Sequence, residues 1–325
     1  MRHAMASATV GDDGHGEDPT VTSLEAKFAS MVNKDAAVFV PSGVMGNQIA
    51  LRILTHPGDV VLVGSTSHVV DFEMGASARN AAIQFTMVDD GTGAPALDQI
   101  ADRLDAEIDH APTVAAIVIE NTQMYSGGVP LDAAQMRELR AVTRDRPIHL
   151  DGARLFNAAV ATGDDLAALT AVASTVTCAL SKGLCAPVGS LLAGDAETIE
   201  RARIERKRLG GSMRQAGFLA AAGIVALETM IERLVDDHAR ARRLAEAFSQ
   251  RFPESDYDPE SCRTNIVAFN HPQARQIVAQ LGDRGVLGET LAPRRARFVT
   301  HHDVDNEMIE LACEVITSLS LEGSS

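Results

Sequence analysis

The chain has 325 residues, of which 46% are hydrophobic, and its formal net charge is −15 at pH 7. This length suffices for about two domains with a large buried core. The acidic balance, with no basic run to offset it, argues against nucleic acid and anionic membrane surfaces as partners. No apolar stretch approaches the roughly 20 residues of a membrane span. Four cysteines without a C-x-x-C pair favour a reduced, cytoplasmic protein.

The first expected element is a helix over residues 20–34. Leu24, Phe28 and Met31 would form its apolar face, and Thr22 with Glu25 fits a capping box. Short runs rich in Val, Ile and Leu then alternate with helical stretches. Seven strands are expected within residues 36–43, 60–65, 82–90, 114–122, 147–153, 175–183 and 189–195. Most of these runs are apolar on both faces, as strands covered by helices must be, so the pattern predicts an open, mostly parallel α/β sheet.

The rest of the chain predicts a helical stretch and then a smaller α+β unit. The pattern is helical from Ala196 to about Phe252. Strands are expected at residues 264–270 and 295–304, and helices at residues 272–285 and 306–319. We therefore expect a large α/β domain over residues 1–235 and a small C-terminal α+β domain over residues 236–325.

Candidate functional residues are those that directly follow the expected strands, because ligands of open α/β sheets bind beyond the carboxyl ends of the strands. These positions hold Ser42 and Gly43, His68, Glu120 and Asn121, Asp151 with Arg154, and Lys182.

Asp151 and Lys182 become informative when they are taken together. Asp151 alone would serve as a helix cap, and most lysines are solvated surface charges. Lys182, however, lies between an apolar strand and the sequence GLCAPVG, where a desolvated amine has a lowered pKa and can form a Schiff base. An acid after one strand and an amine after the next suit a pyridine aldehyde cofactor. The amine would bind the aldehyde carbon, and the acid would keep the ring nitrogen protonated.

Other positions could serve the same cofactor or its substrate. A Ser-Gly turn before a helix that begins near Val44 offers backbone N–H groups to a phosphate, although an ordinary strand–helix turn has the same sequence. His68 could stack on a planar ring, or it could be a loop histidine whose hydrogen bonds are all made within the protein. Arg154, Arg214 and Arg297 lie among apolar or small residues, where guanidinium groups pair with carboxylate or phosphate. For Arg154 a helix-surface position is the strongest alternative.

Several common site signatures are absent from the sequence. No H-x-x-x-H motif or cysteine cluster favours a metal site, so we expect none. No G-x-G-x-x-G, Walker or G-x-S-x-G sequence favours a nucleotide-binding protein or a serine hydrolase.

The motifs that are present, taken in their order along the chain, closely resemble those of the low-specificity L-threonine aldolases. The resemblance covers essentially the whole chain and is carried by GDDGHGEDPTVTSLE, VFVPSGVMGNQIAL, IHLDGARLFNAAVA, LSKGLCAPVGS, GGSMRQAG and RFVTHHDV. These aldolases belong to the beta-eliminating lyase/threonine aldolase superfamily and use pyridoxal 5'-phosphate (PLP). The resemblance therefore implies fold type I of the PLP-dependent enzymes, with a large PLP-binding domain and a small C-terminal domain.

The resemblance also implies roles for individual residues. Lys182 would bind the cofactor covalently, Asp151 would pair with the pyridinium nitrogen, and His68 would stack on the ring near the β-hydroxyl of the substrate. The positions that match the phosphate-binding residues are Ser42, Gly43, Val44 and Arg214. Those that match the arginines at the substrate carboxylate are Arg154, also expected to contact the cofactor, and Arg297. Arg214 corresponds to an arginine that enters a neighbouring subunit, which implies a homotetramer of close dimers with shared sites.

Three positions depart from the family pattern. Val44 stands where threonine is usual, Cys185 where glycine is usual, and Gln123 where a histidine near the substrate hydroxyl is usual. We expect Gln123 to contact the substrate, although it cannot take a proton at neutral pH. Family members also carry an earlier stretch with an Arg-Ser-Asp-Thr sequence. Its absence leaves two expectations: either the true start lies upstream of Met1 or the site is incomplete.

The sequence thus predicts cleavage of L-threonine, L-allo-threonine and related β-hydroxy-α-amino acids to glycine and an aldehyde. His68, directly or through water, would be the base. Two alternatives stay open. One is a PLP-dependent β-eliminating lyase for another amino acid, which the glutamine at position 123 allows. The other is a catalytically impaired homologue that serves as a binding or assembly subunit, although the joint presence of Lys182, Asp151, His68 and the arginines argues against it.

Overall fold

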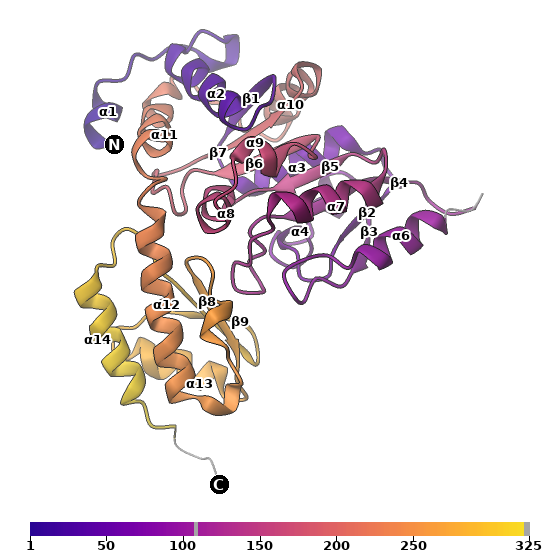
Figure 1. Ribbon diagram of the computed structural model, residues 1–325. Coiled ribbons are helices and arrows are strands. Elements are labelled where there is room, and N and C mark those ends of the chain that lie inside the picture. Colours follow the sequence, from indigo (N-terminus) through magenta and orange to yellow (C-terminus); the bar gives the residue numbers. More distant parts are fainter. Residues whose placement is uncertain (107–109, 322–325) are drawn as a thin grey trace.

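The computed structural model describes residues 1–106 and 110–321. A seven-stranded sheet lies in the upper part of the molecule as drawn in Figure 1, above the C-terminal unit. The strand order is β1-β7-β6-β5-β4-β2-β3. The strands are β1 (Ala36–Val40), β2 (Val60–Gly64), β3 (Gln84–Val88), β4 (Val114–Glu120), β5 (Ile148–Asp151), β6 (Thr175–Ala179) and β7 (Ser190–Gly194). Neighbouring strands are parallel except at β7, which is antiparallel to both β1 and β6. The expected mostly parallel sheet is confirmed.

Helices cover both faces of this sheet, which explains why its strands are apolar throughout. In β1, Phe39 packs on one face, whereas Val38 and Val40 pack on the other. The Phe39 face is covered chiefly by α2 (Pro19–Met31), α6 (Leu97–Asp105), α7 (Ala133–Thr143), α8 (Leu155–Thr162), α9 (Leu166–Thr170) and α11 (Gly217–Thr229). The opposite face is covered by α3 (Gly43–Leu54) and α10 (Ala196–Arg208), and α5 (Ala76–Asn80) packs against α3. Near the N-terminus, α1 (Arg2–Ala6) lies beside α11 (Figure 1).

The start of α2 differs from the prediction. Its N-cap is Asp18, whose side chain accepts hydrogen bonds from the backbone N–H groups of Thr20 and Val21, and Pro19 occupies the first turn. Asp before Pro is a favourable start for a helix, because the proline needs no N–H partner there. The predicted capping box was therefore wrong. Glu25 is instead buried, and it accepts a 2.7 Å hydrogen bond from the backbone N–H of Phe39.

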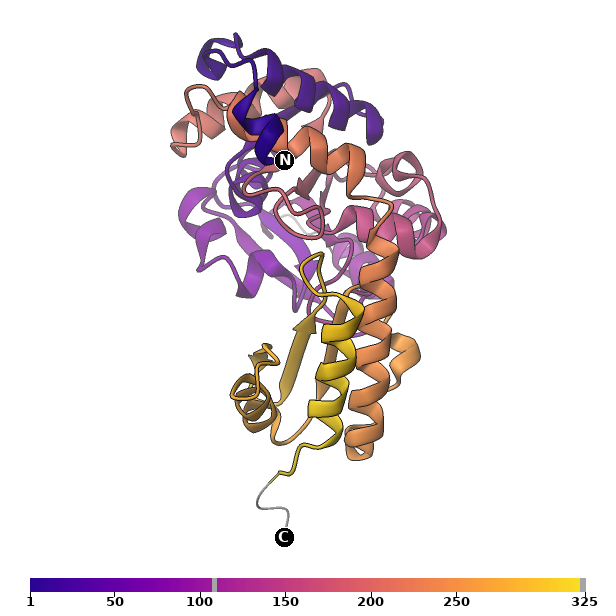
Figure 2. The same cartoon turned by 90° about the vertical axis from the view of Figure 1, so that its left-hand side faces the viewer.

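In the described part of the chain, the C-terminal unit contains a three-stranded antiparallel sheet, three α-helices and two short 3-10 helices. The sheet order is β8-β10-β9, with β8 (Ile266–Asn270), β9 (Glu289–Ala292) and β10 (Arg295–Val299). The α-helices are α12 (Leu234–Arg251), α13 (Ala274–Gly282) and α14 (Asn306–Thr317). In Figures 1 and 2, α12 and α14 run side by side. The prediction missed β9, and the strand expected at residues 295–304 ends at Val299.

Helix α12 connects the two hydrophobic cores. Leu234, at its start, packs in the core of the large sheet, whereas Ala241 and the residues after it pack in a separate C-terminal core. The domain boundary predicted at residue 235 falls in the first turn of α12 and stays a prediction, and residues 322–325 of the expected small domain lie outside the described residues. Among the described helices, none is both long and apolar enough to cross a membrane.

Candidate active site

Lys182 lies in the loop between β6 and β7, directly beyond the carboxyl end of β6. Desolvation and the positive charge of Arg154 lower the pKa of Lys182 to about 8. Within residues 1–106 and 110–321, no hydrogen bond or ion pair engages its amine. A lysine of this kind is partly neutral near physiological pH and is therefore available as a nucleophile.

Asp151 is the last residue of β5, and β5 pairs with β6, so Asp151 lies at the same edge of the sheet as Lys182. Its side chain is buried. Oδ2 accepts a 2.7 Å hydrogen bond from Nδ2 of Asn47, and Oδ1 accepts a 3.0 Å bond from the backbone N–H of Ala153. Helix α8 has Arg154 as its N-cap residue and no side-chain cap. The alternative reading of Asp151 as the cap of that helix is therefore not what the structure shows.

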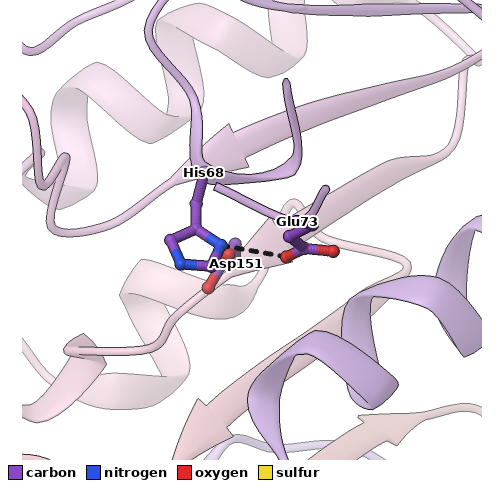
Figure 3. A group of neighbouring side chains, drawn as sticks. All are labelled: His68, Glu73 and Asp151. Atoms are coloured by element: carbon purple, nitrogen blue, oxygen red, sulfur yellow. Dashed lines mark hydrogen bonds and ion pairs between the residues drawn. The ribbon is translucent and has the colours of Figure 1, made fainter. Parts of the chain in front are cut away.

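His68 is the first residue of α4 (His68–Asp71), just after β2. Its Nδ1 lies 3.0 Å from Oε1 of Glu73 (Figure 3). Burial lowers the pKa of His68, but the hydrogen bond to Glu73 and the negative charges of Asp151 and Glu73 outweigh burial, so the pKa is raised. The ring also stacks on Phe72, with centroids 5.7 Å apart.

Glu120 was a candidate without an assigned role; it ends β4, and its carboxyl group is buried. It accepts hydrogen bonds from the backbone N–H groups of His68 and, at 3.2 Å, of Met124. Burial and the negative charge of Asp151 raise the pKa of Glu120 to about 7. The carboxyl group thus holds the start of α4 at the edge of the sheet.

Asn47 connects the acids of the site. Its Nδ2 donates to Oε1 of Glu73 at 2.9 Å as well as to Asp151. One ligand atom each of His68, Glu73 and Asp151 lies within 4.8 Å of the others, a spacing that a metal ion could use. The Asn47 amide, however, donates to both carboxylates, so hydrogen bonds already account for this spacing. Sequence reasoning missed both Asn47 and Glu73, because neither directly follows a strand.

Arg154 and Arg297 bring two cations to the surroundings of Lys182. Burial, followed by the positive charge of Arg297, lowers the pKa of Arg154 to about 10. The Nε atoms of both arginines are buried without a hydrogen-bond partner. Arg297, on β10, forms an ion pair with Glu289 of β9. Two guanidinium groups with unused donors suit an anionic ligand such as a carboxylate.

Ser42, Gly43 and Val44 form the start of α3 at the carboxyl end of β1. The Oγ of Ser42 caps the helix by accepting a 3.2 Å hydrogen bond from the N–H of Met45. Because β7 is antiparallel to both β1 and β6, the start of α3 lies at the same edge of the sheet as Lys182. Ser42 and Val44 are exposed, so the first N–H groups of α3 are placed to meet an anion.

Three other residues singled out in the sequence have different surroundings. Arg214 is exposed and forms an ion pair with Asp12; in the described part of the chain, no hydrogen bond or ion pair joins it to Lys182. Cys185 is half-buried and has a φ of 61°, in the left-handed region that favours glycine. Gln123 is buried, with its polar atoms engaged inside the protein.

The Gln123 amide makes three hydrogen bonds. Nε2 donates to Oγ1 of Thr66 at 2.8 Å and to Oδ2 of Asp90 at 3.1 Å. Oε1 accepts a 2.6 Å bond from the backbone N–H of Ser126. The predicted contact between Gln123 and substrate stays a prediction.

The fold and the site define an α/β protein with a lysine of lowered pKa and an acid at the carboxyl edge of its sheet. The profile of the beta-eliminating lyase family matches residues 1–271. The chain belongs to this family, as the sequence predicted.

Relatives and solved structures agree with this assignment. The low specificity L-threonine aldolase of Escherichia coli K12 is 37% identical over 312 residues, which are 95% of this chain and 92% of that protein. Low-specificity L-threonine aldolase 1 of Arabidopsis thaliana is 34% identical over 338 residues, 100% of this chain and 94% of that protein. The threonine aldolase of Leishmania major has a TM-score of 0.79 at 17% identity and covers 95% of this chain and 91% of its own. The last likeness shows a shared fold and confirms the predicted fold class.

Proposed function

We propose that this protein is a PLP-dependent aldehyde-lyase that cleaves L-threonine, L-allo-threonine and related β-hydroxy-α-amino acids to glycine and an aldehyde. The observation that carries the proposal is the unengaged amine of Lys182, with a pKa of about 8, at the same sheet edge as Asp151. The names of the relatives, low-specificity L-threonine aldolases, support the substrate class.

The residues present fit PLP. Lys182 offers a nucleophilic amine, Asp151 an acid for the ring nitrogen, and His68 a ring to stack on the pyridine. The start of α3, Ser42–Val44, offers N–H groups for the phosphate. When bound, PLP supplies an electron sink for bond cleavage at the substrate Cα.

The chain's own residues would orient the substrate and move its proton. Arg154 and Arg297 would bind the substrate carboxylate with their unused guanidinium donors. This contact fixes the orientation of the substrate's Cα–Cβ bond, and such positioning lowers the activation barrier for its cleavage. The Nε2 atom of His68 would accept the proton of the β-hydroxyl, which is worth about 10²–10⁴-fold in rate. The Cα carbon must take up one proton to give glycine, and this proton balances the one that His68 removes from the hydroxyl.

We also propose a homotetramer of close dimers in which Arg214 reaches the cofactor phosphate of a neighbouring subunit. The exposure of Arg214 supports this, as does its place in a surface hollow of about 310 Å³ that Asp12, His15 and Lys207 also line. The free state of Cys178, Cys185, Cys262 and Cys313 supports a reducing compartment such as the cytoplasm.

The test is a visible spectrum followed by an assay. The purified protein should carry PLP, and borohydride should fix the cofactor to the peptide that contains Lys182. Lys182→Ala should abolish this labelling. L-Threonine and L-allo-threonine should then give glycine in equal amount to the aldehyde. Ammonia and a keto acid in place of glycine would indicate a β-eliminating lyase, and a protein that binds no PLP would contradict the proposal altogether.

A further inference from the structure

Glu73 is a buried carboxylate that lies against His68, and the proposed reaction assigns it no role. Its side chain is fully buried, and Figure 3 shows it on the Nδ1 side of the imidazole. We propose that Glu73 is a positioning residue that keeps the proton of His68 on Nδ1, so that Nε2 is the basic nitrogen offered to the substrate. This inference rests on the proposed role of His68 as the base.

The hydrogen bonds around Glu73 decide the direction of its bond with His68. Oε1 accepts from Nδ2 of Asn47 at 2.9 Å, and Oε2 accepts from Nε2 of Gln48 at 2.7 Å. Both partners are amide donors, an arrangement that suits an ionised carboxylate, which only accepts hydrogen bonds. The atom 3.0 Å away, Nδ1 of His68, must therefore be the donor. A neutral imidazole that donates from Nδ1 has its lone pair on Nε2.

The orientation of the Asn47 amide is fixed from its other side. Oδ1 of Asn47 accepts from Oγ1 of Thr177 at 3.0 Å and lies 3.1 Å from Nε2 of His149. Burial lowers the pKa of His149 to about 4, so this ring is neutral near pH 7. Its Nδ1 lies 2.9 Å from Oγ1 of Thr175, which can donate to it. The carbonyl of Asn47 thus faces these donors, and its NH₂ faces Glu73.

Several charged groups surround His68 and set the direction of a pH effect. Glu73, Asp151 on β5 and Glu120 on β4 are acids near it, and Lys182 is a nearby cation. The acids dominate, and the pKa of His68 is raised. Replacing Glu73 by an uncharged residue removes one of these acids. The pKa of His68 should then fall, and the acid limb of the activity profile should move to lower pH.

The first experiment needs no activity. Histidine labelled with ¹⁵N is incorporated into the cofactor-free protein, and the imidazole nitrogens are observed by NMR over a pH range. His68→Asn identifies the resonances. We expect a protonated Nδ1 and an unprotonated Nε2 in the neutral form, and a mixture of tautomers with a lower pKa in Glu73→Gln. Glu310→Gln, in an exposed ion pair with Arg243, is the matched control and should change neither.

The second experiment measures threonine cleavage against pH. Glu73→Gln should lower kcat/KM about 10- to 100-fold, shift the acid limb to lower pH and leave KM nearly unchanged. A wild-type His68 protonated on Nε2 would overturn the proposal, even if Glu73→Gln does not fold. An unchanged tautomer and pH profile in folded Glu73→Gln would also overturn it. If the expected NMR result appears but the wild type makes no glycine from threonine, the proposed reaction fails while the positioning by Glu73 stands.

Discussion

Asn47 holds Asp151 through a 2.7 Å hydrogen bond that joins residues 104 positions apart in the chain. The bond runs from α3 to the end of β5, and so connects the start of the helix expected at the phosphate with the acid expected at the ring nitrogen. The other oxygen of Asp151 is held by the backbone N–H of Ala153 at 3.0 Å. The carboxylate is therefore fixed from two sides before any ligand binds, a form of preorganisation.

Asp151→Asn should keep PLP binding but lower kcat about 100-fold or more, because an amide cannot stabilise a positive charge on the ring nitrogen. Both oxygens of Asp151 are acceptors, whereas asparagine has only one. One donor is therefore left unpaired, and the free energy of unfolding should fall by about 1–2 kcal/mol. Activity assays and urea unfolding measure these effects. Asp195→Asn, at the exposed cap of α10, is the control and should preserve both. Near-normal turnover in Asp151→Asn would reduce Asp151 to a structural role.

The desolvated amine of Lys182 should lower the free energy of unfolding of the cofactor-free protein at neutral pH. Its pKa is lowered to about 8, against about 10.4 for a free lysine. Between these pH values the unfolded chain binds more protons than the folded one, so stability rises with pH through this window. Lys182→Met should therefore be more stable than the wild type at pH 7, by about 2–3 kcal/mol, and the difference should shrink as pH rises from about 8 to 10.5.

Urea unfolding at a series of pH values checks this difference. Lys207→Met, at an exposed position of α10, is the control and should show no comparable change. A gain at Lys182→Met that does not depend on pH would mean that methionine packing, and not removal of a desolvated charge, stabilises the variant.

Glu289 should compete with the substrate for Arg297. The two residues are cross-strand partners in the β9–β10 ladder and form an ion pair. Glu289→Gln removes a carboxylate that a substrate carboxylate must replace, so KM for threonine should fall about 2- to 5-fold with kcat unchanged. Glu307→Gln, exposed in the first turn of α14, is the control. A higher KM in Glu289→Gln would show instead that Glu289 orients Arg297 for the substrate.

The sequence could predict which charged residues follow the strands, because those strands have a clear pattern. Runs such as those of β5 and β6 are buried on both faces. A charged residue directly after such a run is easily recognised in the sequence. The strand β9 has no such pattern, because two of its four residues are exposed and none is buried. A short, exposed edge strand cannot be distinguished from a loop by its sequence alone.

The polar contacts behind the site could not be predicted for a different reason. Asn47 lies within α3 and meets Asp151 only after the helix has packed on the sheet. Glu73 follows α4 in an irregular segment, where no periodicity indicates which side chains face inward. Such contacts depend on tertiary packing, so they follow from the fold and not from a local pattern.

Gln123 donates a hydrogen bond to Thr66, two residues before the proposed base His68, and its replacement by histidine should have two opposite effects. The Gln123 amide donates two hydrogen bonds, to Thr66 and Asp90, and accepts one from Ser126. A neutral imidazole has only one donor and one acceptor. Gln123→His should therefore lower the free energy of unfolding by about 1–3 kcal/mol. Gln250→His, at an exposed position of α12, is the control for stability.

The same replacement should return an ionisable group to the site. His68→Asn should lower kcat and kcat/KM together, the result expected when a contact made only in the transition state is lost. Gln123→His in that background should recover part of kcat/KM, and the recovery should fade below about pH 6.5, where an unperturbed imidazole is protonated. Threonine cleavage by the two single variants and the double variant, measured against pH, tests this. A double variant no faster than His68→Asn would show that Gln123 serves the packing of the loop after β4 and does not reach the substrate.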